Sequence, residues 1–414
     1  MRLLVLSQYF WPENFRINEL VVELERRGHD ICVLTGWPNY PDGKIFAEFQ
    51  NSPDQWSKIG NTDIVRVPLV PRGHRTIGLV GNYISFALSA ATLGVWKLRG
   101  RAFDAVLVFQ PSPATIGVPS VVLRRLKRAP AVFWVQDLWP DTLAAMGVVR
   151  SRRLLRWADC FLSWVYKHTD HVLAQSQAFL PRLKQQVPTH VPVSYLPNWA
   201  PSGDEAECTD KREKKSVFHI YYLGNIGEAQ DFPTVLDAIA TLAHRDDLHW
   251  NFVGDGRLAD WFAAQLEQRC LTHRVSLHGA FPPEAMPRFH RAADALFVSL
   301  KAEPLFALTV PSKVQSYLAA GVPLLGMLDG EGARIIQDSG AGITSPAGNS
   351  VKLAEAVVDL IEMPQENRLQ MAAAGPAYYR QEFDFVHIVD RLEHILEGLA
   401  KRGNSQQRCT DRWL

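Results

Sequence analysis

The chain has 414 residues, of which 47% are hydrophobic and 21% charged, and its 44 Lys and Arg against 43 Asp and Glu give a net charge of +1. This length predicts about two domains that each bury a core of their own. The balanced charge argues against a protein that binds nucleic acid over its whole surface. Five scattered cysteines without a C-x-x-C pair indicate reduced thiols in a cytoplasmic protein.

The chain opens on a strand candidate at residues 3–7. Its apolar run is too short for a secretory signal, and Trp11 and Pro12 lie soon after it. The longest apolar stretch, residues 77–96, contains Asn82 and several serines and glycines. We therefore expect it to form a largely buried or interface-lying helix rather than a membrane span.

In the first half, short apolar runs alternate with helical patterns. Strands are expected at residues 3–7, 31–35, 63–67, 105–109, 131–135, 171–174 and 193–196, and the helices between them include 18–27, 120–127 and 153–167. This alternation predicts a parallel sheet that is covered by helices on both faces.

A charged segment that is poor in apolar residues, 201–216, separates the two halves and is the expected linker. After it the alternation resumes, with strands expected at 218–223, 250–253, 275–277, 295–299 and 323–327. A last helix is expected at 388–399, after a loop at 381–385, and residues 404–414 are expected to fray.

The sequence therefore predicts an α/β protein of two Rossmann-like domains with parallel sheets, at residues 1–200 and 201–385. Ligands of such sheets bind at the carboxyl ends of the strands, so a cleft between the two carboxyl edges is expected. The fold class alone does not determine the reaction, which has to be inferred from the residues of the strand-to-helix loops.

The densest chemical signal is the segment 309–313, whose Pro311 opens a helical pattern that ends at Gly321. Proline suits a first helical turn, and glycine a helix end. Free backbone N–H groups there, together with the Ser312 hydroxyl and the Lys313 ammonium, would form a binding site for phosphates. An ordinary capped helix with a solvated lysine is the alternative interpretation.

Three further turns follow expected strands in the second half. They contain Gly224 and Asn225, Gly254 and Asp255, and Gly330 and Glu331. Glycine lets the backbone approach a ligand closely, and Glu331 could accept hydrogen bonds from sugar hydroxyls or merely favour the first turn of its helix. None of these turns is a G-x-G-x-x-G or P-loop motif, which disfavours a dinucleotide oxidoreductase and a P-loop ATPase.

In the first half, polar residues follow the expected strands in the same way. Asp137 comes directly after the strand at 131–135, where it could orient an acceptor hydroxyl, act as a general base or cap a helix. The residues expected beside it or after the first strand are Gln136, Trp139, Trp11, Glu13 and Asn14. They are expected to shape one rim of the cleft.

We expect no cofactor and no metal requirement. The sequence contains no H-E-x-x-H pair, no C-x-x-C pair, no G-x-S-x-G elbow and no Asp-x-Asp motif of the kind that could hold a divalent ion on a pyrophosphate. If a pyrophosphate binds, backbone amides and Lys313 must neutralise it.

Two basic segments lie beside apolar residues, at 72–75 and 150–157. Arginines next to Trp and Leu suit the surface of an anionic membrane. A solvated helix face is the commoner outcome for such a run, so both interpretations stay open.

Several segments spread over nearly the whole chain carry a family resemblance. They are residues 7–13, 28–30, 136–140, 223–227, 253–256, 311–323 and 329–331. In these segments the chain resembles glycosyltransferase family 4 of the GT-B fold, and within it the WbuB-like bacterial surface-polysaccharide and O-antigen transferases.

The resemblance implies two facing Rossmann-like domains, with the acceptor bound by the first and a nucleotide sugar by the second. It also implies that a C-terminal helix, 386–403, packs back on the first domain. The donor is then expected to be a UDP-sugar that reacts with retention of configuration. The expected acceptor is a lipid-linked saccharide of the undecaprenyl type at the inner face of the cytoplasmic membrane, where the enzyme would be peripheral.

The roles implied by the resemblance can be placed on individual residues. Lys313 and the helix amides at Ser312 would stabilise the leaving diphosphate, whereas Gly330 and Glu331 would hold the donor. Asp137 would orient the acceptor. The turns at Gly224 and Asn225 and at Gly254 and Asp255 are the remaining donor-side candidates.

The chain departs from the family at three places. The family carries two glutamates separated by seven residues, and here Leu308 and Ser316 hold their places. We transfer the role of the first glutamate, as a catalytic candidate, to the nearby Glu303. Gln136 holds the place of a common histidine, and the basic residue usual after the Gly224 turn is missing.

Two rival functions stay open at this stage. A nucleotide-sugar epimerase can share the same architecture, and it would act on the donor without an acceptor. A non-catalytic partner in a polysaccharide assembly complex would be consistent with the missing glutamates. The sequence does not indicate the sugar, the nucleotide base or the acceptor.

Overall fold

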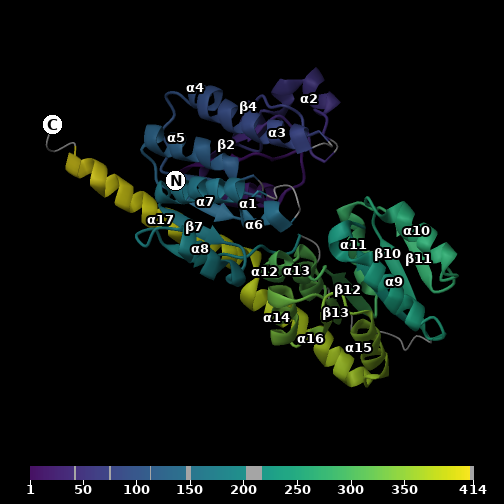
Figure 1. The fold of residues 1–414 in the computed structure, drawn as a ribbon. Coiled ribbons are helices and arrows are strands. Elements are labelled where there is room, and N and C mark those ends of the chain that lie inside the picture. The colour runs from purple at the N-terminus through teal and green to yellow at the C-terminus, as the bar shows by residue number, and fades with distance from the viewer. Residues whose placement is uncertain (42, 74–75, 112, 146–150, 202–216, 411–414) are drawn as a thin grey trace. The chain divides into compact units, whose positions relative to one another are not determined.

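In the computed structural model of the chain, the described residues are 1–414 except 42, 74–75, 112, 146–150, 202–216 and 411–414. The expected linker at 201–216 lies almost entirely outside them. The chain divides into two compact units, with Met1–Leu196 and Val386–Leu414 in unit 1 and Pro197–Phe385 in unit 2 (Figure 1). These divisions lie within four residues of the domain boundaries expected at 200/201 and 385/386.

Unit 1 is built on an eight-stranded sheet with the order β3-β4-β2-β1-β5-β6-β7-β8. Its strands are β1 Arg2–Ser7, β2 Asp30–Gly36, β3 Lys58–Ile59, β4 Thr62–Val67, β5 Ala105–Gln110, β6 Ala131–Val135, β7 His171–Ala174 and β8 Val193–Tyr195. All neighbours pair in parallel except β3 and β4. Because helices cover both faces, the central strands are buried throughout and read as continuous apolar runs.

The helices of unit 1 connect these strands (Figure 1). They are α1 Arg16–Arg26, α2 Ala47–Asn51, η1 Pro53–Trp56, α3 Thr76–Ser89, the π-helical turn η2 Ala90–Gly94, α4 Val95–Lys97, η3 Ala114–Ile116, α5 Gly117–Lys127, α6 Asp141–Ala145, α7 Arg152–Lys167, η4 Gln177–Phe179, α8 Leu180–Gln186 and α17 Phe385–Thr410. The last of these is held to α1 by ion pairs, since Arg27 contacts Asp390 and Glu393, and Glu393 also contacts His29. The helix α17 is thus held to the first unit.

Unit 2 is built on a six-stranded parallel sheet with the order β11-β10-β9-β12-β13-β14. Its strands are β9 Phe218–Leu223, β10 Leu248–Val253, β11 Val275–Gly279, β12 Ala295–Ser299, β13 Leu324–Met327 and β14 Gly342–Ser345. Its helices are η5 Glu228–Gln230, α9 Phe232–Thr241, α10 Ala259–Gln268, η6 Pro283–Ala285, α11 Met286–Ala292, α12 Pro304–Leu308, α13 Ser312–Ala319, α14 Gly330–Asp338, α15 Ser350–Glu362 and α16 Gln365–Glu382.

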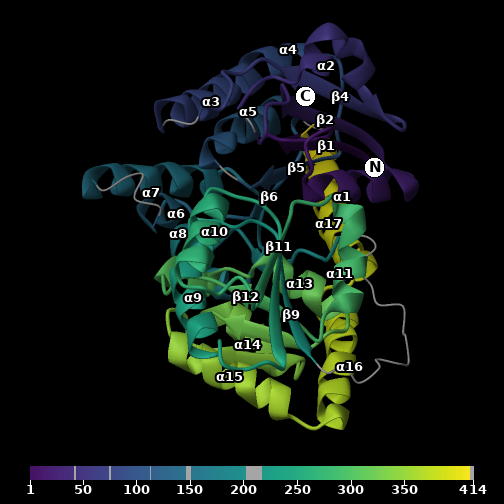
Figure 2. The same cartoon turned by 90° about the vertical axis from the view of Figure 1, so that its right-hand side faces the viewer.

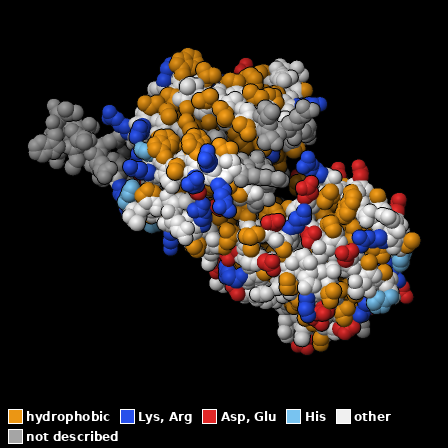
Figure 3. Space-filling model, in the orientation of Figure 1, with side chains coloured by type: hydrophobic (Ala, Val, Ile, Leu, Met, Phe, Trp, Pro, Cys, Tyr) orange, Lys and Arg blue, Asp and Glu red, His pale blue; other side chains and the backbone are white. Residues whose placement is uncertain are grey.

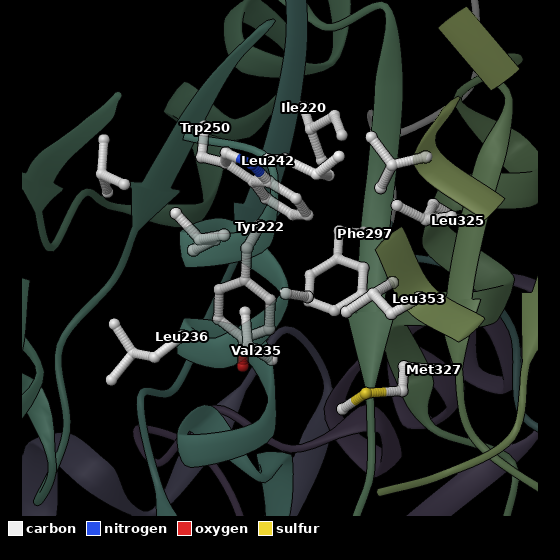
Figure 4. Packing of buried hydrophobic residues seen from close by; sticks show 14 of the residues in the cluster. Ile220, Tyr222, Val235, Leu236, Leu242, Trp250, Phe297, Leu325, Met327 and Leu353 are labelled. Carbon is white, nitrogen blue, oxygen red and sulfur yellow. The ribbon is translucent and has the colours of Figure 1, made fainter. Parts of the chain in front are cut away.

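The core of unit 2 lies on both faces of this sheet, with helices on either side of β9 and β12 (Figure 2). Successive residues of a strand point to opposite faces, so Ile220 and Tyr222 join one cluster and Tyr221 and Leu223 the other. The first cluster packs β9, β10 and β12 against α9 and α15, and Figure 4 shows Tyr222, Trp250 and Phe297 at its centre. The second packs the sheet against α13, α14 and α16.

Each sheet has a point where the direction of its strand order reverses. In unit 1 this is between β1 and β5, and in unit 2 it is between β9 and β12. The loops that follow such a pair of strands diverge, which leaves room for a ligand at the carboxyl edge. The turn at Gly224 follows β9 directly, and the loop at Trp11 follows β1. The topology therefore places candidate residues of each unit at its own reversal point.

The long apolar stretch of the first half forms a helix, as expected. It runs through α3, η2 and α4. Gly78–Lys97 is long and apolar enough to cross a membrane by length and composition alone, and 33% of its most apolar 18-residue stretch is buried. One side of it packs on the unit, since a Cβ at Gly94 would lie 2.9 Å from the Leu34 side chain of β2. Phe86 on the same side is fully buried.

Three features differ from the expectations. The short strand β3 and the edge strand β14 were not expected. The strand β3 has only two residues, and β14 consists largely of small, half-buried residues, so neither carries a clear apolar signal. The helix α16 extends to Glu382 and α17 begins at Phe385, so the expected loop at 381–385 shrinks to two residues. The expected frayed tail is wrong up to Thr410, since Lys, Arg and Gln favour helix and no proline intervenes.

Candidate functional site

The two glycine turns that follow β9 and β10 form a single layer. Gly224 has φ 126° and Gly254 has φ 149°, and a Cβ at Gly254 would overlap the carbonyl oxygen of Gly224. Backbone hydrogen bonds join the turns, from the Gly224 N–H to Val253 O at 2.8 Å and from the Ile226 N–H to Asp255 O at 2.9 Å. Only glycine fits both positions, so exposed backbone is kept at this edge.

Lys313, at the start of α13, reaches this layer. A Cβ at Gly224 would lie 3.0 Å from both its Cε and its Nζ, and Nζ lies 4.8 Å from the centre of the Tyr222 ring. The structure thus brings Lys313 and Gly224, which are 89 positions apart in the sequence, into direct contact. A side chain at Gly224 would displace the ammonium.

The ammonium of Lys313 has no hydrogen-bonding or acidic partner among the described residues. Burial lowers its pKa from 10.5 to about 8, since desolvation disfavours the charged form. A cation–π contact with Tyr222 compensates only part of that cost. An unpaired, partly buried cation next to free backbone is a site that an anion would complete.

The start of α13 adds backbone donors to the same place. Pro311 precedes the helix with extended backbone, φ −61° and ψ 134°, and Ser312 is the exposed first helical residue. The first N–H groups of a helix have no acceptor within it, and the helix dipole favours negative charge there. The expected phosphate site is therefore supported by three independent features, namely the helix start, the unpaired ammonium and the glycine layer.

Two tyrosines that were not expected in the site organise it. Tyr317 follows Lys313 by one helical turn, and its hydroxyl accepts from the Leu223 N–H at 3.0 Å. That amide is left free because β9 and β12 separate before it. The Tyr222 hydroxyl donates to the Asn225 carbonyl at 2.5 Å and so shapes the first turn. An aromatic residue at i+4 from the lysine was the one signal in the sequence for Tyr317.

The remaining candidates of unit 2 surround this layer. Asn225 and Asp255 are exposed on their turns, and Asp255 Oδ1 accepts from the Gly256 N–H at 2.7 Å. Gly330 starts α14 with φ 66°, and a Cβ there would overlap the Ala307 carbonyl oxygen of α12. Gly330 therefore allows the close approach of two helices.

The acidic candidates differ in how free they are. Glu331 is buried, and Arg334 binds its carboxylate at 2.8 and 3.0 Å, so its charge is already neutralised within α14. Glu303 is exposed in front of α12, and its carboxylate does not cap that helix. Glu303 lies on the loop between β12 and α12, and Glu331 lies in the first turn of α14, which follows β13.

In unit 1, Asp137 lies on the loop two residues after the end of β6, and its side chain is partly buried. Among the described residues no hydrogen bond or ion pair engages its carboxylate. Burial alone raises its pKa from 3.8 to about 7. A carboxyl group with such a pKa can hold or accept a proton at neutral pH, which is what a general base requires. The alternative role as a helix cap has no support from a hydrogen bond.

The carboxylate of Glu13 is buried and bound by backbone amides, so it is not open to a ligand. Its carboxylate is 2% exposed and accepts from the backbone N–H groups of Asn39 and Tyr40, both at 2.8 Å, and of Phe10 at 3.2 Å. Burial nevertheless raises its pKa to about 7. Glu13 thus ties the loop after β1 to the loop after β2.

A buried network that the sequence did not reveal extends this tie. The Asn82 side chain of α3 accepts from Gln8 at 2.6 Å and donates to the Val70 carbonyl at 2.7 Å. It also lies 3.3 Å from Asn39 Oδ1. A single amide inside an apolar helix was the available signal, because a buried amide must find partners.

The other candidates of unit 1 line the loops after β1 and β6. Trp11 is partly exposed, its ring centre lies 4.8 Å from that of Trp56 in a tilted contact, and Asn14 is exposed. Gln136 is buried, and the partly exposed Trp139 has its ring 6.2 Å from that of Tyr83. Among the described residues, no group of three or more His, Cys, Asp and Glu is placed to hold a metal ion.

These features define a class of protein. Residues 14–199 match the model of the glycosyl transferase 4-like domain, and residues 217–363 match that of the glycosyl transferases group 1. The chain belongs to the glycosyltransferases, and its two parallel-sheet α/β units are those of the GT-B fold, as expected from the sequence.

Particular relatives lie within this class. The chain is 28% identical to the probable glycosyltransferase WbjE of Pseudomonas aeruginosa over 279 residues, which are 64% of this chain and 68% of that protein. It is 24% identical to the putative colanic acid biosynthesis glycosyl transferase WcaI of Escherichia coli K12 over 345 residues, 78% and 82% of the two chains. Its fold is similar to that of Anabaena HepE in complex with UDP and glucose, with a TM-score of 0.67, 15% identity and coverage of 96% and 100%.

Proposed function

We propose that this glycosyltransferase moves a sugar from a UDP-sugar onto a lipid-linked acceptor of the undecaprenyl type in the biosynthesis of a bacterial surface polysaccharide. The observation that carries the donor part is the unpaired ammonium of Lys313 beside the Gly224 backbone. The name of WcaI and the UDP bound by HepE support the pathway and the nucleotide. An O-antigen is one such polysaccharide.

In this proposal, unit 2 binds the diphosphate of the donor. Lys313 and the first N–H groups of α13 at Ser312 face the charge that develops on the leaving UDP, and stabilising that charge lowers the barrier. The glycine layer lets the diphosphate approach the backbone closely. No metal ion is required, because the ammonium and the helix start supply the positive charge.

Unit 1 prepares the acceptor. Asp137, with its pKa raised to about 7, accepts the proton of the acceptor hydroxyl or orients that hydroxyl. The loop that contains Trp11 and Asn14 follows β1 of the same sheet, and Glu13 holds it in place through hydrogen bonds to the loop after β2. This loop is the proposed acceptor rim. Glu303 keeps its proposed role on the donor side because its carboxylate is exposed. Retention of configuration follows the family resemblance.

A lipid-linked acceptor would bring the enzyme to the inner face of the cytoplasmic membrane as a peripheral protein. The direct test is a transfer assay with purified protein, a panel of UDP-sugars and undecaprenyl-diphosphate saccharides, in the presence of EDTA. Formation of a longer lipid-linked saccharide together with UDP supports the proposal. A new nucleotide sugar formed without acceptor would indicate an epimerase, and the absence of UDP binding would indicate a non-catalytic partner.

A further inference from the structure

One face of unit 1 carries a continuous exposed apolar ridge. The ridge follows α3, η2 and α4 and consists of Val80, Ile84, Leu88, Leu93 and Trp96, which are 45–59% exposed. Residues 76–96 contain no charged side chain. The π-helical turn inserts one residue, so the spacing of four between Val80, Ile84 and Leu88 continues at Leu93 rather than at residue 92.

The ridge is not the side by which this helix packs on unit 1. The opposite side of the same helix is packed, with Phe86, Ala90 and Gly94 buried against the unit. The helix thus has one satisfied apolar side and one unpartnered apolar side. A soluble surface would normally carry charged residues on the second side.

A second exposed apolar row lies on α7. Trp157 is 70% exposed and its ring stacks on Phe161 at 6.1 Å, which stacks in turn on Trp164 at 6.1 Å. Leu154 continues the row one turn earlier and is 58% exposed. Three stacked aromatic rings at the surface are a rigid, amphipathic row of the kind found at membrane interfaces.

The two rows belong to one face. Helix α5 packs against both α3 and α7, and its own Leu126 is 61% exposed. Figure 3 shows apolar side chains spread over this part of the molecule, with Lys and Arg side chains next to them. We call the exposed sides of α3, η2, α4 and α7 the α3–α7 face.

Three arginines of α7 beside the aromatic row are exposed and unpaired. Arg152, Arg153 and Arg156 are exposed beside Trp157, and none of them forms an ion pair with another described residue. The single acidic residue of α7, Asp159, is bound by Arg182 at 2.8 Å. The aromatic row is thus flanked by arginines that are free to bind anions from outside the unit.

We infer that the α3–α7 face docks on a lipid bilayer that contains anionic lipids, with its apolar rows among the acyl chains and its arginines on the phosphate headgroups. The inference rests on the proposed function, which needs access to a lipid-linked acceptor. A second copy of the chain is a poorer occupant. In a symmetric dimer these arginines would have to pair with acidic residues of the same face, and Asp159, the acidic residue of α7, is already bound by Arg182.

The test measures binding of the purified full chain to vesicles of phosphatidylcholine with and without phosphatidylglycerol. Binding is expected only with phosphatidylglycerol and is expected to fall with added salt. Replacing Arg152, Arg153 and Arg156 together by Ala should weaken it on the order of a hundredfold, since each basic residue contributes about fivefold. The ridge variant Val80→Ser/Ile84→Ser/Leu88→Ser should weaken it at least as much.

A matched control is Val351→Ser/Leu369→Ser, which replaces two apolar residues of unit 2 with 61% and 49% exposure. It should bind vesicles as the native chain does. All replaced residues are exposed, so the variants should keep the native melting temperature, which is measured alongside.

Stabilisation by UDP separates this inference from the proposed function. Normal UDP stabilisation without vesicle binding, or vesicle binding that the α3–α7 variants do not change, would overturn the docking surface and leave the donor site standing. Vesicle binding through this face without any UDP stabilisation would instead contradict the proposed donor. A stable dimer that the ridge variant dissociates would identify a second copy as the occupant and would overturn the bilayer.

Discussion

Replacing Lys313 by Met removes the unpaired ammonium of unit 2 and keeps the apolar stem of the side chain. A pKa lowered from 10.5 to about 8 corresponds to a penalty of at most roughly 3 kcal/mol for the charged form at pH 7, reduced by the partial exposure of the side chain. The cation–π contact with Tyr222 returns about 0.5–1 kcal/mol. We therefore expect Lys313→Met to be more stable by about 1–2 kcal/mol and to melt a few degrees higher.

The same variant should lose affinity for UDP. A charge-assisted hydrogen bond contributes about 1.5–3 kcal/mol, so the Kd should rise about 10- to 100-fold. Isothermal titration calorimetry with UDP and melting curves with and without UDP measure both effects. The control Lys352→Met removes an exposed lysine of the same unit, which pairs with Glu355 at 2.5 Å, and should change neither quantity much.

The pH dependence of stability and of UDP affinity tests whether the lowered pKa of Lys313 causes these effects. Because the pKa of Lys313 is lowered in the folded state, the unfolded chain binds more protons between pH 8 and 10.5, and the native protein gains stability over that range. The difference in Tm between the native chain and Lys313→Met should therefore shrink above pH 8. The affinity of the native protein for UDP should fall there too, whereas Lys313→Arg keeps its charge. A lower Tm for Lys313→Met, or an unchanged Kd, would refute the reasoning.

Three further predictions concern other parts of the two sites. Gly330→Ala should destabilise unit 2 far more than Gly340→Ala, because both have φ near 60° but only the first meets the backbone of α12; chemical denaturation compares them, and equal losses would contradict the close approach. Tyr317→Phe leaves a buried amide of β9 unpaired and should cost about 1–3 kcal/mol, seen as a lower Tm, and an unchanged Tm would show that water replaces the hydroxyl. Asp137→Asn removes a carboxyl group whose folded pKa, about 7, is raised, so the native chain loses stability between about pH 4 and 7. The melting temperature of the variant should thus exceed the native one above pH 7 but not near pH 4, while transfer activity and its rise around pH 7 should be lost; a pH-independent difference in Tm would argue against the raised pKa.

Much of the fold could be predicted from local pattern. The strands at 131–135, 171–174, 218–223 and 295–299 were predicted to the residue, because strands covered on both faces read as mainly apolar runs between turn residues. The edge strand β14 was missed for the opposite reason, since its residues are largely half-buried and small. The helix α17 was predicted too short because polar residues continue a helix as readily as they end one.

The sequence by itself determined which residue types follow which strands. Asp137, Gly224, Gly254 and Lys313 could be singled out because the carboxyl ends of parallel strands, and the starts of the helices that follow, meet at one edge of a sheet. Its pattern also determined the division into two α/β units, since the alternation of strands and helices stops at a charged segment and starts again after it.

Only the tertiary structure decided what these residues do. Lys313 lacks a partner and meets Gly224, a contact between residues 89 positions apart that no local spacing indicates. The carboxyl groups of Asp137 and Glu13 both have a pKa near 7, yet one is unpartnered and the other binds three amides. The physical reason is that desolvation and hydrogen bonding depend on neighbours brought together from distant parts of the chain, which the order of residues does not specify locally.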